Sequence, residues 1–385
     1  MTHRERVMAA LSHEAPDRVP MDLGGSVAST ITSDGYPALR AALGLPVHPK
    51  HMAQLYSSLP EIEEDVRVAL DVDIIHAPRA FGTGDTVQVI SENALIDEWG
   101  VRWCKPEVGP FYVETPLFST DATARDVREY NWPKAEKLVN TKGLRDAINK
   151  IRSETDYAIS LELRGRMMSM GQFLCGFENW FINMAANESF VHELLEHTTQ
   201  LQIQSNHIVL HEVGDLVDIV YTTDDLGSQR GPLISPKSFQ CLLKPYFRKL
   251  WEHIRGTTSA KFMHHSCGSI LEFIPAFIEM GAQALNPIQV SADNMDPVKL
   301  KAEFGKDLCF WGGVDTRDVM PNGTTADVRD EVARRIKQMA HGGGYILAAV
   351  HDIAVEVPPT NIIALFNAGR ELGTYPLKYI NSDII

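Results

Sequence analysis

Residues 261–288 have the sequence KFMHHSCGSILEFIPAFIEMGAQALNPI. This stretch begins with Lys261–His265, where two apolar residues, Phe262 and Met263, precede a polar cluster, which predicts a strand. Gly268 permits a sharp turn into a segment with helical spacing, and an apolar run, Ala284–Ile288, predicts another strand. A strand, a helix and a second strand in this order are typical of a parallel sheet, because parallel strands need a crossover connection.

The same alternation extends along the chain in both directions. Helical spacing is clear in Asn187–Val213, Thr325–Ala340 and Pro359–Leu372. Ser235 as N-cap and Pro236 at the first helical position predict the start of another helix. Eight strands separated by helices predict an α/β fold, a (β/α)8 TIM barrel, with an open doubly wound sheet as the alternative. The predicted strands are Val19–Leu23, Val72–His76, Tyr157–Leu163, Ile219–Thr223, Lys261–His265, Ala284–Ile288, Leu308–Gly312 and Tyr345–Val350.

One stretch interrupts this alternation. Thr86–Cys104 contains the segments VQVI, SENALIDEWG and VRWC, which predict a hairpin inserted after the second strand. We therefore expect most of Phe81–Trp132 to be an insertion that caps one end of the barrel. No linker rich in proline and glycine divides the sequence, so residues 1–385 are expected to form a single domain.

The composition excludes several classes of protein. Hydrophobic residues make up 44% of the chain, and 36 Lys and Arg against 50 Asp and Glu give a net charge of -14. That charge argues against a non-specific nucleic-acid binder and against docking on an anionic membrane. Five scattered cysteines do not suggest a disulfide framework. The apolar run Val7–Leu11 is too short for a signal peptide, so a cytoplasmic protein is predicted, either monomeric or a homo-oligomer.

A metal site is one interpretation of the residues at two strand ends, where barrels of this class place their active sites. His265 and Cys267 are two residues apart, so their side chains share one face of an extended segment. Imidazole and thiolate are common zinc ligands. The alternative is that His265 only forms hydrogen bonds and Cys267 packs as a small apolar side chain. His351 is the candidate third ligand, or else a histidine that supports the site or binds the substrate.

Charged residues stand at other strand ends. Asp224 and Asp225 follow the fourth strand, where a carboxylate can bind a metal, act as a base or hold a substrate hydroxyl; helix capping is the alternative. Glu162 and Arg164 alternate onto one face of the third strand, as a functional pair or an internal salt bridge. Asp315 follows the seventh strand and is expected at the mouth of the barrel.

Soft and aromatic side chains follow the third strand in MMSMGQFLCGFENWFINM, residues 167–184. Most of these side chains are expected to pack in the core. Met168, Phe173 and Phe177 are candidates to line an apolar pocket for an aromatic or methylated substrate. No Gly-x-Gly-x-x-Gly follows a strand and neither a P-loop nor a Gly-x-Ser-x-Gly motif occurs, which argues against a dinucleotide site, a P-loop site and a serine hydrolase.

Three groups of segments together resemble the uroporphyrinogen decarboxylase superfamily, over nearly the whole chain. The resemblance implies a (β/α)8 barrel. It also implies one of two chemistries: decarboxylation of a tetrapyrrole's acetate arms without a cofactor, or zinc-dependent methyl transfer that involves a corrinoid protein. The segments are DDLGSQRGPLISPKSF (224–239), FMHHSCGSI (262–270) with GAQALNPIQ (281–289), and FWGGVDT (310–316) with GGGYILAAVHDIAVEVPPTNI (342–362).

Two details of the resemblance favour methyl transfer. The decarboxylases hold their substrate's carboxylates with an arginine-rich segment near the N-terminus, whereas the matching residues 19–40 contain no arginine before Arg40. The His-x-Cys of His265 and Cys267 resembles the zinc motif of the corrinoid-linked methyltransferases. The methylthiol-forming members use a cysteine as third ligand, and His351 stands at the matching position here. Glu162, Asp224 and Asp225 are the other candidates for that ligand.

The resemblance implies a methyltransferase that removes a methyl group from a small methylated substrate, such as a methoxylated aromatic. The group would pass to the cobalt of a separate corrinoid protein, because the chain lacks the Asp-x-His-x-x-Gly signature of corrinoid binding. Zinc would act as a Lewis acid on the leaving oxygen. The alternatives are a decarboxylase of a less acidic substrate and a non-catalytic barrel that binds a corrinoid protein or a small ligand. The implied catalytic residues are Asp224, Asp225 and Glu162, and the implied substrate-binding residues are Arg164, Met168, Phe173, Phe177 and Asp315.

Overall fold

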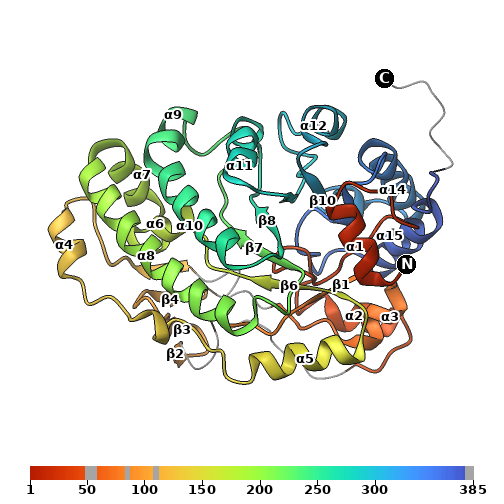
Figure 1. Ribbon diagram of the computed structural model, residues 1–385, viewed down its shortest axis with the longest axis horizontal. Coiled ribbons are helices and arrows are strands. Elements are labelled where there is room, and N and C mark those ends of the chain that lie inside the picture. The colour runs from red at the N-terminus through yellow and green to blue at the C-terminus, as the bar shows by residue number, and fades with distance from the viewer. Residues whose placement is uncertain (48–58, 83–86, 107–111, 378–385) are drawn as a thin grey trace.

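The computed structural model describes residues 1–47, 59–82, 87–106 and 112–377 (Figure 1). Seven parallel strands form one curved sheet, in the order β1-β6-β7-β8-β9-β10-β11, and helices surround it. The fold is therefore an α/β barrel of the TIM class, as the sequence predicts. The strands are β1 Ile74–His76, β6 Ala158–Glu162, β7 Ile219–Thr223, β8 Lys261–His265, β9 Ala284–Asn286, β10 Cys309–Val314 and β11 Tyr345–Ala349.

The first predicted strand, Val19–Leu23, differs from the prediction. It contributes only an isolated parallel bridge between Met21 and Leu347 of β11. On its other side, the amide of Asp73 donates to the carbonyl of Met21 (2.8 Å), just before β1. Pro20 has no N–H group to donate, so a longer ladder cannot form there. This short segment thus stands in the place of an eighth strand, between the two edges of the sheet.

The helices agree closely with the helical spacing of the sequence. The predicted Pro359–Leu372 coincides with α15, and Ser235 accepts a hydrogen bond from the amide of Ser238 (3.0 Å) as the expected N-cap. The helices are α1 His3–Leu11, α2 Tyr36–Ala42, α3 Glu64–Leu70, α4 Ala124–Glu129, α5 Leu144–Glu154, α6 Met168–Cys175, α7 Phe177–Ala186, α8 Glu188–Val213, α9 Pro236–Ser238, α10 Lys244–Thr257, α11 Ile274–Met280, α12 Pro297–Phe304, α13 Val319–Asn322, α14 Thr325–Met339 and α15 Pro359–Leu372, with 3-10 turns η1 Ala135–Lys137 and η3 Leu271–Phe273 and a π-helical turn η2 Phe239–Leu243.

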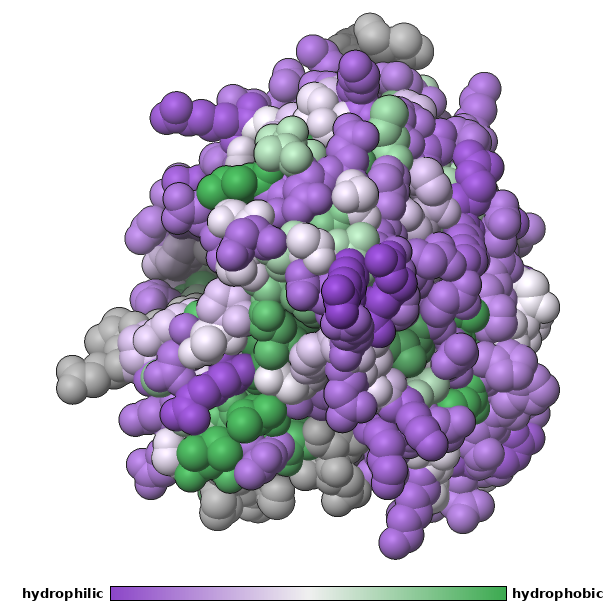
Figure 2. Space-filling model, turned by 90° about the vertical axis from the view of Figure 1, so that its left-hand side faces the viewer, coloured by the Kyte–Doolittle hydropathy of each residue, from purple (hydrophilic) through white to green (hydrophobic). Residues whose placement is uncertain are grey.

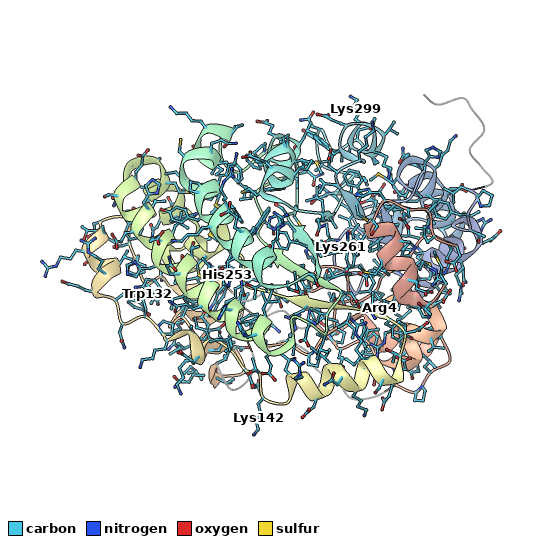
Figure 3. All side chains as sticks on the ribbon, viewed as in Figure 1. Arg4, Trp132, Lys142, His253, Lys261 and Lys299 are labelled. Carbon is cyan, nitrogen blue, oxygen red and sulfur yellow. The ribbon has the colours of Figure 1, made fainter. Side chains whose placement is uncertain are left out.

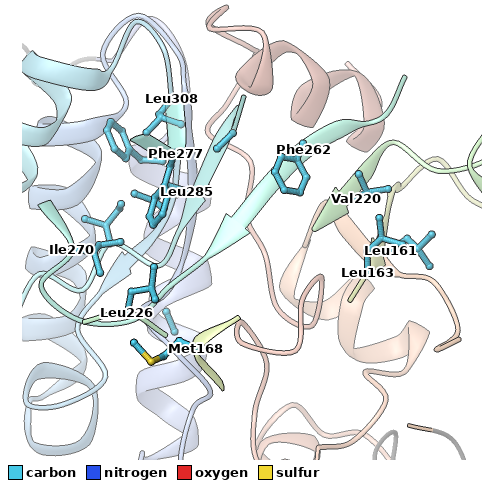
Figure 4. Close-up of a cluster of buried hydrophobic side chains, with 14 of the residues drawn as sticks. Leu161, Leu163, Met168, Val220, Leu226, Phe262, Ile270, Phe277, Leu285 and Leu308 are labelled. Carbon is cyan, nitrogen blue, oxygen red and sulfur yellow. The ribbon is translucent and has the colours of Figure 1, made fainter. Parts of the chain in front are cut away.

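The core has two layers because successive side chains of a strand point to opposite faces. Ile219 and Tyr221 of β7 belong to the inner cluster, inside the barrel, whereas Val220 belongs to the outer cluster between the sheet and the helices. Figure 4 shows part of the outer cluster, with Val220 and Phe262 on neighbouring strands. Side chains on both faces of the strands are therefore apolar, as in other parallel sheets.

Helix α1 covers the amino-terminal end of the barrel. Its apolar residues Val7, Ala10 and Leu11 join the inner cluster. Its polar face reaches the starts of two strands, where Arg4, labelled in Figure 3, donates to Asp218 (2.8 Å) and Arg6 donates to the fully buried Asp73 (2.5 Å). The opposite end of the barrel, where the strands finish, is left for a site.

The hairpin expected after the second predicted strand is present as part of a larger structure. Between β1 and β6 the chain forms an antiparallel sheet in the order β2-β3-β4-β5. Trp132, labelled in Figure 3, packs edge-on against Trp99 from the β3–β4 turn, with ring centres 6.5 Å apart. Residues 83–86 and 107–111 of the predicted insertion lie outside the described residues. The strands are β2 Gln88–Ser91, β3 Ala94–Ile96, β4 Arg102–Cys104 and β5 Tyr112–Thr115.

The face of the molecule drawn in Figure 2 is mostly hydrophilic. Figure 2 shows small hydrophobic patches on the face that includes α4 and α7. Phe177, at the start of α7, is 62% exposed, and its ring is tilted against that of Phe181, with ring centres 5.0 Å apart. Among the described residues, no helix combines the length and the apolar content needed to cross a membrane.

Candidate metal centre

His265, Cys267 and His351 lie together where β8 and β11 end. One ligand atom from each side chain lies within 4.8 Å of the other two. The rings of His265 and His351 meet edge to face, with centres 5.6 Å apart. Two imidazole nitrogens and one thiolate sulfur fit a zinc ion, and three protein ligands leave a position open for a substrate. The cluster is therefore a candidate metal centre.

A close approach of two loops positions Cys267. Gly268 has a φ of +89°, and a Cβ atom there would lie 2.4 Å from the carbonyl carbon of Gly227. Only glycine fits this position, so the loop after β8 can press against the loop after β7. The amide of Cys267 then donates to Oδ1 of Asp225 (2.9 Å), which fixes the backbone that carries the thiol.

Asn286 orients the ring of His265. Nδ1 of His265 lies 2.6 Å from Oδ1 of Asn286, whose amide nitrogen donates to the carbonyl of Trp311 (3.2 Å). The amide of Asn286 therefore presents its oxygen to the ring, and Nδ1 of His265 is the donor. Nε2 of His265 faces the cluster, 3.4 Å from Sγ of Cys267. A ring held in this way directs Nε2 toward the cluster, where this nitrogen would bind a metal in its unprotonated form.

The neighbouring His264 has a different environment. Its ring points out of the barrel, 4.7 Å from the ring of Trp251, and hydrogen-bonds to Oγ1 of Thr222 (3.0 Å). Burial, together with the nearby charge of His265, lowers the pKa of His264 to about 3. Of the two adjacent histidines, only His265 reaches the cluster.

The charges around the cluster are coupled. Burial alone acts to lower the pKa of His265, but the negative charges of Cys267 and Asp225 outweigh it and raise that pKa well above the ordinary value. Burial in turn acts to raise the pKa of Asp225, and the hydrogen bond and charge of His265 hold it well below the usual range. Burial and the charge of His265 lower the pKa of His351 to about 4, which keeps this ring neutral at pH 7.

Asp224 and Asp225 point in different directions. The carboxylate of Asp224 is buried and accepts hydrogen bonds from the amides of Met167 (2.7 Å), Met168 (2.7 Å) and Ser169 (2.8 Å) at the start of α6. Burial raises the pKa of Asp224 to about 6. The side chain of Asp225 is 52% exposed, and its Oδ1 lies 3.5 Å from Nε2 of His265.

Two adjoining cavities open at this end of the barrel. The first, of about 250 Å³, contains His265 and His351. The second, of about 320 Å³, is lined partly by the turn between β3 and β4 and partly by β4 of the inserted sheet. Arg166 and Phe173 line both. The first cavity is lined by Val27, Ala28, Leu59, Arg166, Ser169, Phe173, Thr223, Asp224, Asp225, His265, His351 and Asp352. The second is lined by Phe81, Gly82, Asp97, Glu98, Trp99, Trp103, Glu162, Leu163, Arg164, Gly165, Arg166, Met170, Phe173 and Gln202.

Glu162 and Arg164 both line the second cavity, but each has another partner. Glu162 accepts from Arg79 (2.7 Å), and Arg164 donates to Glu98 (2.6 Å) and lies over the ring of Phe81 (4.8 Å). Burial acts to raise the pKa of Glu162, and the charge of Arg79 outweighs it, so this pKa is lowered. The two residues are not paired with each other.

Three of the predicted substrate-binding residues lie away from both cavities. Met168 is fully buried, and its sulfur accepts from Nε1 of Trp180 (3.2 Å). Phe177 is on the outer surface. Asp315 accepts hydrogen bonds from the amides of Arg317 (2.9 Å) and Asp318 (3.2 Å) in the turn after β10. Phe173, by contrast, lines both cavities.

Sequence reasoning missed Asn286, Arg166 and Asp352. Asn286 is a polar residue inside the apolar run ALNPI, near the end of a predicted strand, and this position could have identified it as a site residue. Arg166 is two residues after Arg164, and Asp352 follows His351 directly. Burial raises the pKa of Asp352 to about 7, and its Oδ1 accepts from the amide of Thr30 (3.3 Å).

Comparisons with known proteins agree with this architecture. A family model described as uroporphyrinogen decarboxylase (URO-D) matches residues 107–372. A methyltransferase from Methanosarcina mazei has a TM-score of 0.65 at 18% identity, over 96% of this chain and 99% of the other. A GH113 beta-1,4-mannanase covers 91% of this chain and 99% of its own at 9% identity, and its TM-score of 0.41 is too low for an argument. No curated protein sequence matches this chain.

Proposed function

Because this chain belongs to the uroporphyrinogen decarboxylase family, we propose that it is a zinc-dependent methyltransferase of that family. It would take a methyl group from a small methylated substrate, such as a methoxylated aromatic, and pass it to the cobalt of a separate corrinoid protein. The observation that carries the proposal is the cluster of His265, Cys267 and His351, in which the two histidines line a cavity. The fold shared with a methyltransferase from Methanosarcina mazei is consistent with it.

The three side chains would hold the zinc ion. Asn286 keeps Nε2 of His265 turned toward the cluster, and Asp225 keeps Cys267 in place through its amide. Bound zinc would supply Lewis-acid polarisation of the leaving heteroatom of the substrate. An ion with two nitrogen ligands and one sulfur ligand keeps a position free for that atom.

Asp225 is the carboxylate best placed beside the substrate. The oxygens of Asp224 are occupied by the start of α6, and Glu162 is paired with Arg79. Asp225 is half-exposed on the wall of the cavity that contains His265. As an ionised carboxylate it would position the substrate.

The surroundings of Arg40 argue against a polycarboxylate tetrapyrrole as the substrate. Arg40, the first arginine of the segment that resembles the carboxylate-binding part of the decarboxylases, is only 2% exposed. Both of its terminal nitrogens are bound to Asp65, at 2.8 Å and 2.7 Å. Arg40 therefore cannot hold the carboxylates of a substrate without losing its ion pair with Asp65.

Metal analysis of the purified protein tests the metal centre. We expect about one zinc per chain in the wild type and its loss in Cys267→Ala, because a zinc site with three protein ligands depends on each of them. Cys241→Ala is the matched control, because Cys241 is an exposed free cysteine that lines neither cavity. Wild-type protein that holds no zinc after preparation in zinc-containing medium would overturn the proposal.

Methyl transfer is tested separately. Zinc-loaded protein is mixed with a methoxylated aromatic and cob(I)alamin, and methylcobalamin is followed by its absorbance. Formation of methylcobalamin by the wild type, and its absence with Cys267→Ala, is the expected result. Release of carbon dioxide from a carboxylated substrate by zinc-free protein would instead favour a decarboxylase.

A further inference from the structure

The geometry points to Arg166 as the residue that selects the substrate, by binding a carboxylate group on it. This inference rests on the proposed function and narrows its substrate class to methylated carboxylic acids with an apolar, ring-sized body.

Arg166 is the cationic side chain of the cavities that has no close carboxylate. The described lining residues include two arginines, Arg164 and Arg166. Arg164 has Glu98 at 2.6 Å, whereas the nearest carboxylate oxygen recorded for Arg166 is that of Glu162, at 3.8 Å. Nε of Arg166 donates to Oγ1 of Thr223 (3.3 Å). Within the described part of the chain, the two terminal nitrogens of Arg166 have no hydrogen bond.

Glu162 does not neutralise Arg166, because its other oxygen is engaged by Arg79 at 2.7 Å. The single negative charge of Glu162 is thus shared between the guanidinium groups of Arg79 and Arg166. The side chain of Arg166 is 36% exposed, so it can be reached by a ligand. A guanidinium fork with free N–H groups matches the two oxygens of a carboxylate.

The position of Arg166 would determine the orientation of a bound acid in the cavity. It lines the same cavity of about 250 Å³ as His265 and His351. Asp225 lies on the metal side of this cavity, 3.5 Å from Nε2 of His265, and its carboxylate repels an anionic group. A methylated acid would therefore place its carboxylate at Arg166 and its methyl-bearing end toward the metal ligands.

The surroundings of Arg166 suit an apolar body. Phe173 lines both cavities, with its ring centre 5.7 Å from the guanidinium carbon of Arg166. Trp103 meets Phe173 edge to face at 5.0 Å. An aromatic ring stacks on such side chains, and a cavity of this size accommodates one ring with its substituents.

Isothermal titration calorimetry with two matched probes tests this inference. The probes are 4-methoxybenzoate and the neutral 4-methoxybenzamide, titrated into the full-length protein as purified. We expect the wild type to prefer the acid, and Arg166→Gln to bind the acid about ten- to hundredfold more weakly, since a charged hydrogen-bonded pair is lost. Binding of the amide should be unchanged in this variant. Arg166→Lys keeps the charge but not the fork, so it should retain part of the preference.

Arg125→Gln is the charge-matched control, because Arg125 is 76% exposed on α4. Equal affinity of the wild type for acid and amide, no binding of either, or undiminished acid binding by Arg166→Gln would overturn the inference. Zinc is measured in the same samples. Arg166-dependent acid binding in protein without zinc would support this inference and contradict the metal centre. Bound zinc in protein that shows no preference for the acid would support the metal centre and contradict this inference.

Discussion

Nδ1 of His265 lies 2.6 Å from Oδ1 of Asn286, the last residue of the neighbouring strand β9. The two strands are paired in register at these residues, so the sheet itself sets this distance. A ligand of the candidate metal centre is thereby held by a rigid element rather than by a loop.

Asn286→Leu should weaken zinc binding about 10- to 100-fold, the usual effect of removing a partner that orients a metal-bound histidine. Competition with a chromophoric chelator measures the affinity. Asn286→Asp retains an oxygen acceptor for Nδ1 and should retain most of the affinity. Equal zinc affinity of the wild type and Asn286→Leu, with both proteins folded, would contradict this role for Asn286.

Asp224→Ala should lower the free energy of unfolding by about 3 kcal/mol, because it removes a buried carboxylate that accepts several hydrogen bonds from the start of α6. Urea denaturation followed by circular dichroism measures this change. Asp225→Ala is the comparison, and it should change stability by less than about 1 kcal/mol, since this side chain is half-exposed. Similar losses in the two variants would mean that Asp224 has no special structural role.

The ion cluster of Asp73 predicts a pH dependence of stability. Burial acts to raise the pKa of Asp73, but the hydrogen bond from His3 and the charges of Arg18 and Arg6 outweigh it, so this pKa is lowered. A carboxyl whose pKa is lower in the folded state stabilises the fold above its ordinary pKa, and this contribution is lost as the pH falls. We expect the melting temperature of the wild type to drop steeply below about pH 4.

Asp73→Asn tests the origin of that drop. It should be less stable than the wild type at pH 7 by roughly 3 kcal/mol, because Arg6 and Arg18 lose their buried partner. The difference between the two proteins should shrink on acidification. A difference that stays constant from pH 7 to pH 3 would show that the charge of Asp73 is not responsible.

Gly268→Ala should lower both stability and zinc content. The φ of +89° strains an alanine, and its Cβ would collide with the backbone of Gly227, so we expect a loss of about 2 kcal/mol or more. Gly256→Ala in α10 is the matched control, because a Cβ there meets no atom within 4 Å. That control should be neutral or slightly stabilising, since alanine favours a helix. Thermal melting and metal analysis compare the two variants.

The order of strands and helices could be predicted because several of the buried strands are continuous apolar runs between segments of helical spacing. Ile219–Thr223 and Lys261–His265 have the predicted bounds. Val19–Leu23 has an equally apolar sequence, but its partners lie at the two ends of the sheet, and no local pattern shows where those ends meet. Pro20 was the one local sign that this segment does not form a regular strand.

The candidate site was only partly predictable. That strand ends converge follows from the class of fold, which is why His265 and His351 could be grouped from their positions in sequence. The hydrogen bond between His265 and Asn286, the helix start that surrounds Asp224 and the different surroundings of Arg164 and Arg166 depend on contacts between distant segments. Such contacts are set by tertiary packing, which spacing along one chain does not reveal.

The inserted sheet has a consequence for how this barrel could change its substrate. Trp99 and Trp103 come from the insertion between β1 and β6, whereas His265 and His351 come from β8 and β11 on the other side of the shared wall of Arg166 and Phe173. The residues of the insertion that line the second cavity and the residues of the candidate metal centre are thus separate in sequence. Substitutions in the insertion can therefore reshape the second cavity while the ligands of the candidate metal centre stay unchanged, so that, under the proposed function, the substrate could change and the reaction remain.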